Sequence, residues 1–508
     1  MPATRIRLQT GTDTTLAQGI AEIQREMKLP AVFPPEVDAA ATQAAAQPRL
    51  PALDRTDVPL VTIDPPGSMD LDQAMHLERR VGGYRVFYAI ADVAAFVAPG
   101  DAVDAETHRR GETLYGADSR IPLHPPVLSE GAASLLPDQL RPALLWTIDL
   151  DTGGEIAAID VRRARVRSRA RLDYAGVQQQ IDAGTADPLW SLLREVGELR
   201  QRREQARGGI SLTLPEQEVS VTDGQWRLDY RVNHPIEDWN AQISLLTGMA
   251  AAQLMVKGGV GLLRTLPPPA PQSIARLKLT AQVLGIPWPS TQSYPDFIRS
   301  LDPARDTHVA MLTACTTVLR GAGYAAFDGG LPAQPEQSAL AAEYSHATAP
   351  LRRLVDRYVG EVCVALCANQ PVPGWARAAL PALPELMAEA DRRAHQYERQ
   401  VIDLVEAVLL APRVGESFQG AIVEANGAEH DRGNGHAGAA AAHSGVVMLR
   451  DPAIEARVIS ATPLPLGEEV TVRLAEADPA RRVVRFELVP GGQLGAWATV
   501  RSPMVDSL

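Results

Sequence analysis

The sequence predicts an α+β protein with a short helical N-terminal region, a large mixed central domain and a small C-terminal β-barrel. In the central part, β-type runs come first and helical patterns follow, an order that favours α+β over repeating βαβ units. A separate group of about five short β-rich runs near the C-terminus is typical of a small OB-type barrel. The length of 508 residues suits about three domains.

We expect the helical region over residues 1–50, the central domain over 51–412, the barrel over 413–491 and a tail over 492–508. In the first region, Thr15–Met27 carries apolar side chains at helical spacing. The Ala-rich stretch over 39–51 has the composition of a linker.

The central domain opens with strand patterns. The runs PLVTID, DQAMHLERR and YRVFYAIADVAAFV follow one another, and Gly82-Gly83 predicts a hairpin turn between the last two. The runs LLWTIDL and EIAAIDVRRARVRS predict a second hairpin. Helical patterns dominate from Ile236, with long amphipathic runs from Ala349 to Leu410.

The C-terminal block carries the runs FQGAIVEA, GVVMLR, EARVIS, EEVTVRLAEA and VVRFELV. A Gly/Ala/His-rich insert interrupts the first two. Its residues His430, His436 and His443 are irregularly spaced with no cysteine nearby, which favours a solvated loop over a metal site.

Bulk composition excludes several classes of protein. The formal net charge of −12 gives no sign of a nucleic-acid partner. The three cysteines are too few for a disulfide framework, which fits a reducing cytoplasm, and the spacing of Cys363 and Cys367 suits buried small side chains on a helix. No apolar segment is long enough to predict a membrane role. Nothing indicates an obligate protein partner.

A carboxylate cluster is the segment richest in chemistry. Asp64 ends a predicted strand, a Pro-Pro-Gly turn follows, and Asp70 and Asp72 stand two positions apart, so both point to one side of an extended segment. Carboxylates so close together favour a hard divalent ion such as Mg²⁺. Two Mg²⁺ would balance three Asp and one phosphodiester, as in two-metal phosphoryl transfer. A plain polar turn is the alternative.

The run TIDPPGSMDLDQA resembles the catalytic signature of the ribonuclease II and ribonuclease R (RNB) family. Further segments similar to family motifs follow in the family's order: IADV, DAETHRRGETLYGADSRIPLHPPVLSEGAASLLP, NHPIEDWNAQISLLTGMAA, EYSHATAPLRRLVDRYV and AHQYERQVIDLV. The resemblance implies an RNB-type catalytic domain. It also implies a processive hydrolytic 3′→5′ exoribonuclease that degrades single-stranded RNA to nucleoside 5′-monophosphates. The implied cofactor is a pair of Mg²⁺ ions, for which Mn²⁺ can substitute.

By position in these motifs, the resemblance also implies residue roles. Asp64, Asp70 and Asp72, with Gln73 as the fourth position, would hold Mg²⁺, and Arg352 would contact the scissile phosphate. Asp70, Asp72 and Arg352 would thus be catalytic. RNA contacts are implied for Arg110, Tyr115, Arg352, Arg353 and Glu398, with the Tyr115 ring stacking on terminal bases.

One position departs from the family pattern. The fourth residue of the signature, normally Asp, is Gln73, whose amide oxygen can still ligate or hydrogen-bond but carries no charge. Two functions therefore remain open: an active enzyme with a three-Asp site, which we favour, and a catalytically weak RNB-fold protein that binds RNA or regulates.

Three further features bear on the function, and two of them leave alternatives open. Arg163, Arg165, Arg167, Arg169 and Arg171 alternate on one strand face, either as a phosphate-binding stripe or as a solvated face paired with acidic neighbours. The C-terminal block resembles the S1-type OB domain of the family. The N-terminal region could touch nucleic acid like a helix-turn-helix or pack as an arm on the central domain.

Overall fold

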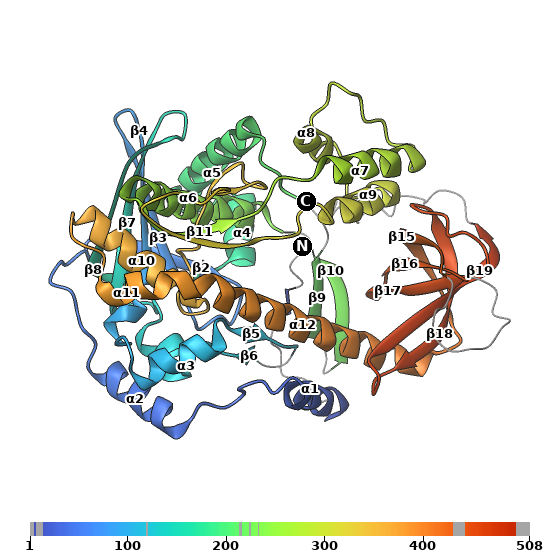
Figure 1. Ribbon diagram of the computed structural model, residues 1–508, viewed down its shortest axis with the longest axis horizontal. Coiled ribbons are helices and arrows are strands. Elements are labelled where there is room, and N and C mark those ends of the chain that lie inside the picture. The colour runs from blue at the N-terminus through green and yellow to red at the C-terminus, as the bar shows by residue number, and fades with distance from the viewer. Residues whose placement is uncertain are drawn as a thin grey trace.

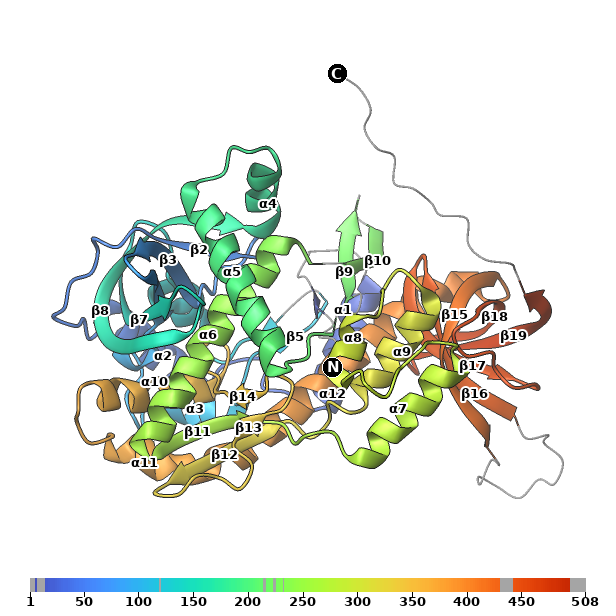
Figure 2. The same cartoon turned by 90° about the horizontal axis from the view of Figure 1, so that it is seen from above.

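The computed structural model describes residues 5–6, 14–117, 120–212, 216–222, 225–231, 233–429 and 442–493. Two β-barrels lie at opposite ends of the molecule, and helix α12 (Leu383–Leu410) runs from one toward the other (Figure 1, Figure 2). The predicted α+β class with a C-terminal barrel is confirmed. Among the described helices, none combines the length and the apolar character needed to cross a bilayer.

The first barrel forms from the strands predicted to open the central domain: β2 (Leu60–Asp64), β3 (Gln73–Arg80), β4 (Gly83–Ala91), β7 (Leu140–Asp151) and β8 (Ile156–Asp173). Both predicted hairpins are present as β3–β4 and β7–β8. The barrel closes where β2 pairs in parallel with β8. At the β3–β4 turn, Gly83 has a φ of 153°, and a Cβ there would lie 1.9 Å from the Leu150 carbonyl oxygen.

The strands of this barrel bury both faces, as alternation requires. One face carries Met75, Tyr88 and Trp146 and packs under α5 (Pro188–Arg207), α6 (Pro235–Gly258) and α10 (Leu354–Cys367). The other face carries small residues such as Ala74, Ala89 and Ala164 and packs with α2 (Pro35–Ala46).

The second barrel closes in the order β15-β16-β17-β19-β18. Its strands are β15 (Ser417–Glu429), β16 (Ala442–Arg450), β17 (Ala453–Ser460), β18 (Glu469–Asp478) and β19 (Val483–Gln493). The barrel is anchored to the helix α9 (Asp306–Thr316), where Arg450 pairs with Asp306 at 2.6 Å and Val309 packs with Val423 and Met448.

The remaining elements surround these two barrels. The helices are α1 (Thr14–Glu26), α3 (Ala102–Arg110), α4 (Tyr174–Asp182), α7 (Pro271–Val283), α8 (Tyr294–Arg299) and α11 (Gly374–Ala379), with short turns η1 (Val93–Ala95), η2 (Val127–Ala132), η3 (Leu380–Ala382) and η4 (Ala411–Arg413). The strands are β1 (Arg5–Ile6), β5 (Leu114–Tyr115), β6 (Arg120–Ile121), β9 (Glu216–Thr222), β10 (Gln225–Arg231), β11 (Val260–Thr265), β12 (Gly323–Asp328), β13 (Glu336–Gln337) and β14 (Ala342–Glu343).

The N-terminal region differs from its prediction at one point. The Ala-rich stretch expected as a linker forms most of helix α2, because Pro35 starts a helix and the alanines that follow have the highest helix propensity. Helix α1 packs on α12, whereas α2 packs on α3 and η2. Both helices therefore pack against the central domain, while a nucleic-acid contact by this region stays a prediction.

Two smaller expectations concern cysteine and histidine. All three cysteines are free thiols; Cys315 and Cys363 are buried and Cys367 is half-buried. The predicted solvated loop with His430 and His436 lies outside the described residues, while His443 stands half-buried in β16.

Candidate active site at the end of the first barrel

The carboxylate segment crosses from one barrel strand to the next. Asp64 is the last residue of β2, the chain turns at Gly67 with a φ of 83°, and β3 begins directly after Asp72. The Ser134 hydroxyl pins this turn, since it donates to the Met69 carbonyl at 2.6 Å and accepts from the Leu71 N–H at 3.0 Å. The turn thus has a fixed shape at the barrel end.

Asp72 joins this turn to a segment far along the chain. Its Oδ1 accepts a hydrogen bond of 2.8 Å from the backbone N–H of Leu351, and its Oδ2 lies 3.7 Å from Nε of Arg352. The Asp72 carboxylate is almost fully buried, whereas the Arg352 side chain is 45% exposed. Arg352 is therefore held beside the carboxylates while its guanidinium remains accessible to solvent.

Burial governs the charges of these carboxyl groups. It raises the pKa of Asp64 to about 6, against the opposing pull of Arg352. Burial also raises the pKa of Asp72 well above its ordinary value, opposed by Arg352 and by the N–H of Leu351. The nearby charge of Asp70 adds to both shifts. A bound cation would stabilise the charged form of both carboxyls, which burial disfavours.

Asp70 has its own cation. Arg120 donates to Asp70 Oδ1 at 2.7 Å and pairs with Glu130 at 2.7 Å. The described residues contain no group of three or more His, Cys, Asp or Glu already arranged to hold a metal ion. The three predicted ligands therefore interact electrostatically, and Arg120 already engages one oxygen of Asp70.

Tyr115 stands against the same charges. It is opposite Arg120 in the short β5–β6 pair, and its side chain is half-buried. Burial raises the pKa of Tyr115; the charge of Arg352 opposes this shift, and the charges of Asp70 and Asp72 add to it. The structure thus brings this predicted stacking ring to the carboxylates and the arginine.

Gln73 is held at both ends of its amide. Its Nε2 donates to the Thr348 carbonyl at 2.6 Å, and its Oε1 accepts from the Tyr88 hydroxyl at 2.9 Å. The Tyr88 oxygen in turn lies 2.8 Å from the Ser244 hydroxyl on α6. The amide therefore links the barrel wall to the segment that carries Arg352.

Arg353 turns to a different partner from its neighbour Arg352. Its guanidinium forms a two-pronged ion pair with Asp356, with distances of 2.9 and 2.8 Å. Asp356 is 1% exposed and also accepts the Ala349 N–H at 2.7 Å. This pairing gives Arg353 a structural task, although its predicted RNA contact is not tested by it.

Arg110 does not join the site, which corrects its predicted role in RNA contact. The side chain is buried, with Nε on Glu106 at 2.8 Å and further donors on the Pro122 and Val32 carbonyls. Its guanidinium also lies 3.7 Å from the ring centroid of Phe33. With its donors engaged in the interior, Arg110 ties α3 to the N-terminal arm.

Glu398 and the arginine stripe occupy the surroundings. Glu398 is half-buried on α12, the helix that packs against β5, so it lies on the element beside Tyr115.

In the arginine stripe, Arg163 pairs with Asp92 at 2.9 Å and Arg165 with Asp54 at 3.2 Å, whereas Arg167, Arg169 and Arg171 are exposed. The acidic pairing therefore holds for one end of the stripe.

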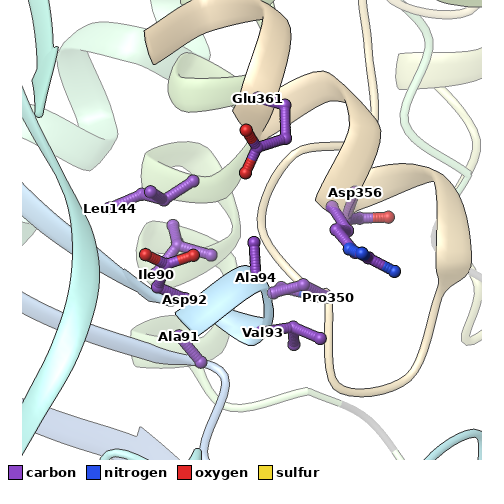
Figure 3. A pocket seen from close by; sticks show the side chains of 10 residues that line it. Ile90, Ala91, Asp92, Val93, Ala94, Leu144, Pro350, Asp356 and Glu361 are labelled. Carbon is purple, nitrogen blue, oxygen red and sulfur yellow. The ribbon is translucent and has the colours of Figure 1, made fainter. Parts of the chain in front are cut away.

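A small cavity has Asp92, Pro350, Asp356 and Glu361 among its lining residues (Figure 3). Asp92 and Glu361 share the guanidinium of Arg163 there, and Pro350 and Asp356 line the side next to the site. Asp92, Glu361 and Asp356 are all paired with arginines, so we interpret the cavity as a structural part of the site and not as a binding pocket.

The sequence analysis did not predict four further residues of the site, namely Arg120, Tyr88, Thr348 and Asp356. The sequence did contain one indication for Arg120: it follows Tyr115 by five positions, a spacing that suits partners in a short hairpin. The other three act through groups that any sequence contains: a buried hydroxyl, a backbone carbonyl and a carboxylate three positions from an arginine.

Comparison with known proteins agrees with this arrangement. Residues 53–368 match the RNB domain, which is more than half of the chain. The chain belongs to the RNB family. Residues 416–489 match the RNase II-type exonuclease C-terminal S1 domain, which confirms the S1-like assignment of the second barrel.

Among curated relatives of this RNB chain, Ribonuclease R of Escherichia coli is 27% identical over 404 residues, covering 74% of this chain and 49% of the relative. The human exosome complex exonuclease RRP44 is 28% identical, covering 58% of this chain and 32% of the relative. The chain thus spans about half, or less, of the length of these relatives.

Solved structures show the same fold. Mycoplasma genitalium RNase R in complex with ribose-methylated single-stranded RNA superposes with a TM-score of 0.81 at 18% identity, covering 94% of this chain and 78% of that one. Yeast Ssd1, a pseudonuclease, superposes with a TM-score of 0.67 at 16% identity, covering 91% and 58%. The same fold therefore occurs both in an RNase R and in a pseudonuclease.

Proposed function

We propose that this RNB-family chain is a Mg²⁺-dependent, processive 3′→5′ exoribonuclease that hydrolyses single-stranded RNA to nucleoside 5′-monophosphates. The observation that carries the proposal is the grouping of Asp72, Arg352 and Tyr115. These residues come from three distant segments, and each has the chemistry needed beside a terminal phosphodiester. The Ribonuclease R relatives support the same reaction class.

The donors near Asp72 fit a hard divalent cation. Asp64, Asp70 and Asp72 would hold Mg²⁺, because carboxylate oxygens are its preferred ligands and a cation would stabilise the charged forms of Asp64 and Asp72 that burial disfavours. When bound, the ion supplies a more acidic water and charge neutralisation at the phosphate. Two ions, or Mn²⁺ in their place, are compatible with three carboxylates.

The protein's own groups bind and orient the RNA. The exposed guanidinium of Arg352 would hold the scissile phosphate and offset the charge that grows during hydrolysis. The ring of Tyr115 would stack on a base near the 3′ end, a contact that tolerates any sequence. Glu398 and Arg353 are proposed as further RNA contacts, and the exposed end of the arginine stripe as an outer phosphate contact.

A catalytically weak RNA-binding or regulatory protein is the second candidate. Gln73 favours it, because a neutral amide stands where the family signature has a carboxylate. The pseudonuclease among the solved structures has the same fold. This candidate predicts RNA binding without release of mononucleotides.

Product chemistry separates the two candidates. Purified chain would be incubated with linear and with circular single-stranded RNA in Mg²⁺, in Mn²⁺ and in EDTA, and the products separated by chromatography. We expect nucleoside 5′-monophosphates from linear RNA in either metal, none in EDTA and intact circles. RNA that is bound but unchanged in both metals would favour the second candidate, and cut circles would show an endonuclease.

A further inference from the structure

Gln73 lies in a directed chain of hydrogen bonds that ends on the Arg352 segment. A carbonyl oxygen can only accept, so the contact with Thr348 fixes Nε2 on that side of the amide. Oε1 must then accept from Tyr88, and Tyr88 can only accept from Ser244. The chain runs from α6 through the barrel wall into the loop before Arg352.

Asp72, the residue before Gln73, binds the same loop at Leu351, three positions after Thr348. Asp72 accepts the Leu351 N–H at 2.8 Å, while Gln73 donates to the Thr348 carbonyl at 2.6 Å. Asp356 holds Ala349 between them. Residues 72 and 73 therefore clamp the backbone on both sides of the turn that leads to Arg352.

A carboxylate at position 73 could not make this clamp. It has no proton to donate at neutral pH, so its oxygen would face the Thr348 carbonyl oxygen, acceptor against acceptor. The amide is the group that this loop requires.

We propose that Gln73 is a positioning residue, which sets the Arg352 segment through Thr348 and does not serve the metal. This inference rests on the proposed function, since it concerns where Arg352 meets RNA. It implies that the departure from the family signature is matched to the loop of this chain and does not mark lost activity.

The test uses Gln73→Glu and Gln73→Met, which keep the side-chain length and remove the donor, with and without a new charge. Tyr88→Phe leaves Gln73 in place and removes the hydrogen bond that the Tyr88 hydroxyl donates to the amide oxygen. Gln282→Glu, exposed on α7, is the matched control for the chemical change. Circular dichroism melting verifies that each variant is folded.

Two readouts are measured for each variant: turnover of single-stranded RNA across a Mg²⁺ titration, and RNA affinity in EDTA. We expect Gln73→Glu and Gln73→Met to lose about tenfold to a hundredfold in kcat, the range for one unpaired buried group. Tyr88→Phe should lose less. In all three the Mg²⁺ midpoint should remain within about twofold of wild type, RNA affinity should fall, and Gln282→Glu should match wild type.

A metal-ligand role predicts the opposite pattern. Gln73→Glu would then lower the Mg²⁺ midpoint, Gln73→Met would raise it, and affinity in EDTA would be unchanged; that result overturns the inference. If one Gln73 variant does not fold, the other and Tyr88→Phe still decide. If wild type releases no nucleotide, the proposed function fails, while the affinity comparison still tests the position of Arg352.

Discussion

The backbone N–H of Leu351 donates to Oδ1 of Asp72 over 2.8 Å, across a separation of 279 positions in the chain. The two residues belong to two different segments that resemble family motifs, the carboxylate turn and the loop that carries Arg352. Their hydrogen bond joins the two segments, so we expect a change in either one to affect both the carboxylates and Arg352.

Loss of the Tyr115 ring should weaken RNA binding. We expect Tyr115→Ala to reduce affinity for a short oligonucleotide by about 1–3 kcal/mol, the usual value of one stacked base. Tyr115→Phe keeps the ring and should stay near wild type. Fluorescence anisotropy in EDTA measures both, and equal losses for the two variants would show that the hydroxyl and not stacking is responsible.

Removing Arg120 should release Asp70 for the metal. Its ion pair with Asp70 at 2.7 Å opposes a cation at that carboxylate. In Arg120→Gln we expect the Mg²⁺ concentration for half-maximal turnover to fall several-fold, because the site becomes more negative. The Mg²⁺ titration reports this directly. A higher midpoint would mean that Arg120 shapes the metal site instead of competing with it.

The Arg353–Asp356 pair should contribute strongly to stability. Asp356→Asn breaks a buried pair and weakens the hold on Ala349, which should cost about 3–5 kcal/mol. Arg377→Gln removes a similar pair with Asp328 whose side chains are 52% and 49% exposed, and it should cost at most about 1 kcal/mol. Thermal unfolding compares them, and equal shifts would contradict the account of burial.

Stability should fall as pH rises through the titration of Glu406. Burial raises the pKa of this α12 carboxyl from 4.5 to about 8. Between these values the folded chain holds a proton that the unfolded chain has lost, so folding is favoured at low pH and weakened toward pH 8, by up to about 1.4 kcal/mol per pH unit.

Glu406→Gln is the matched variant, since it keeps the shape and cannot ionise. Its unfolding temperature should change less than that of wild type between pH 5.5 and 8.5. Parallel curves for the two proteins would show that Glu406 does not titrate in this window.

Local patterns predicted much of the fold. The hairpins β3–β4 and β7–β8 follow from alternation and from turn residues, and the order of the motifs placed Asp64, Asp72, Tyr115 and Arg352. Barrel closure between β2 and β8 was not predicted, because parallel pairing of strands about a hundred residues apart leaves no local pattern.

The site residues that were wrongly placed or missed show the same limit. In the sequence, Arg110 does not differ from any other arginine near Tyr115. Its burial follows from its contacts with Glu106 and Phe33 in the folded protein. The partners of the Gln73 amide, the Thr348 carbonyl and the Tyr88 hydroxyl, likewise come from positions that no local pattern connects to it. Partners that come together through folding are invisible to motif spacing.

The most direct test of the central claim follows a 5′-labelled single-stranded RNA in Mg²⁺ over time. The account predicts a product that shortens from the 3′ end, stops on addition of EDTA, and slows by about 10²–10³-fold or more in Asp72→Asn, the scale for loss of a charge-stabilising group. Asn keeps the acceptor for Leu351, so the fold should persist. Undegraded RNA with wild type, or equal degradation by wild type and Asp72→Asn, would contradict it.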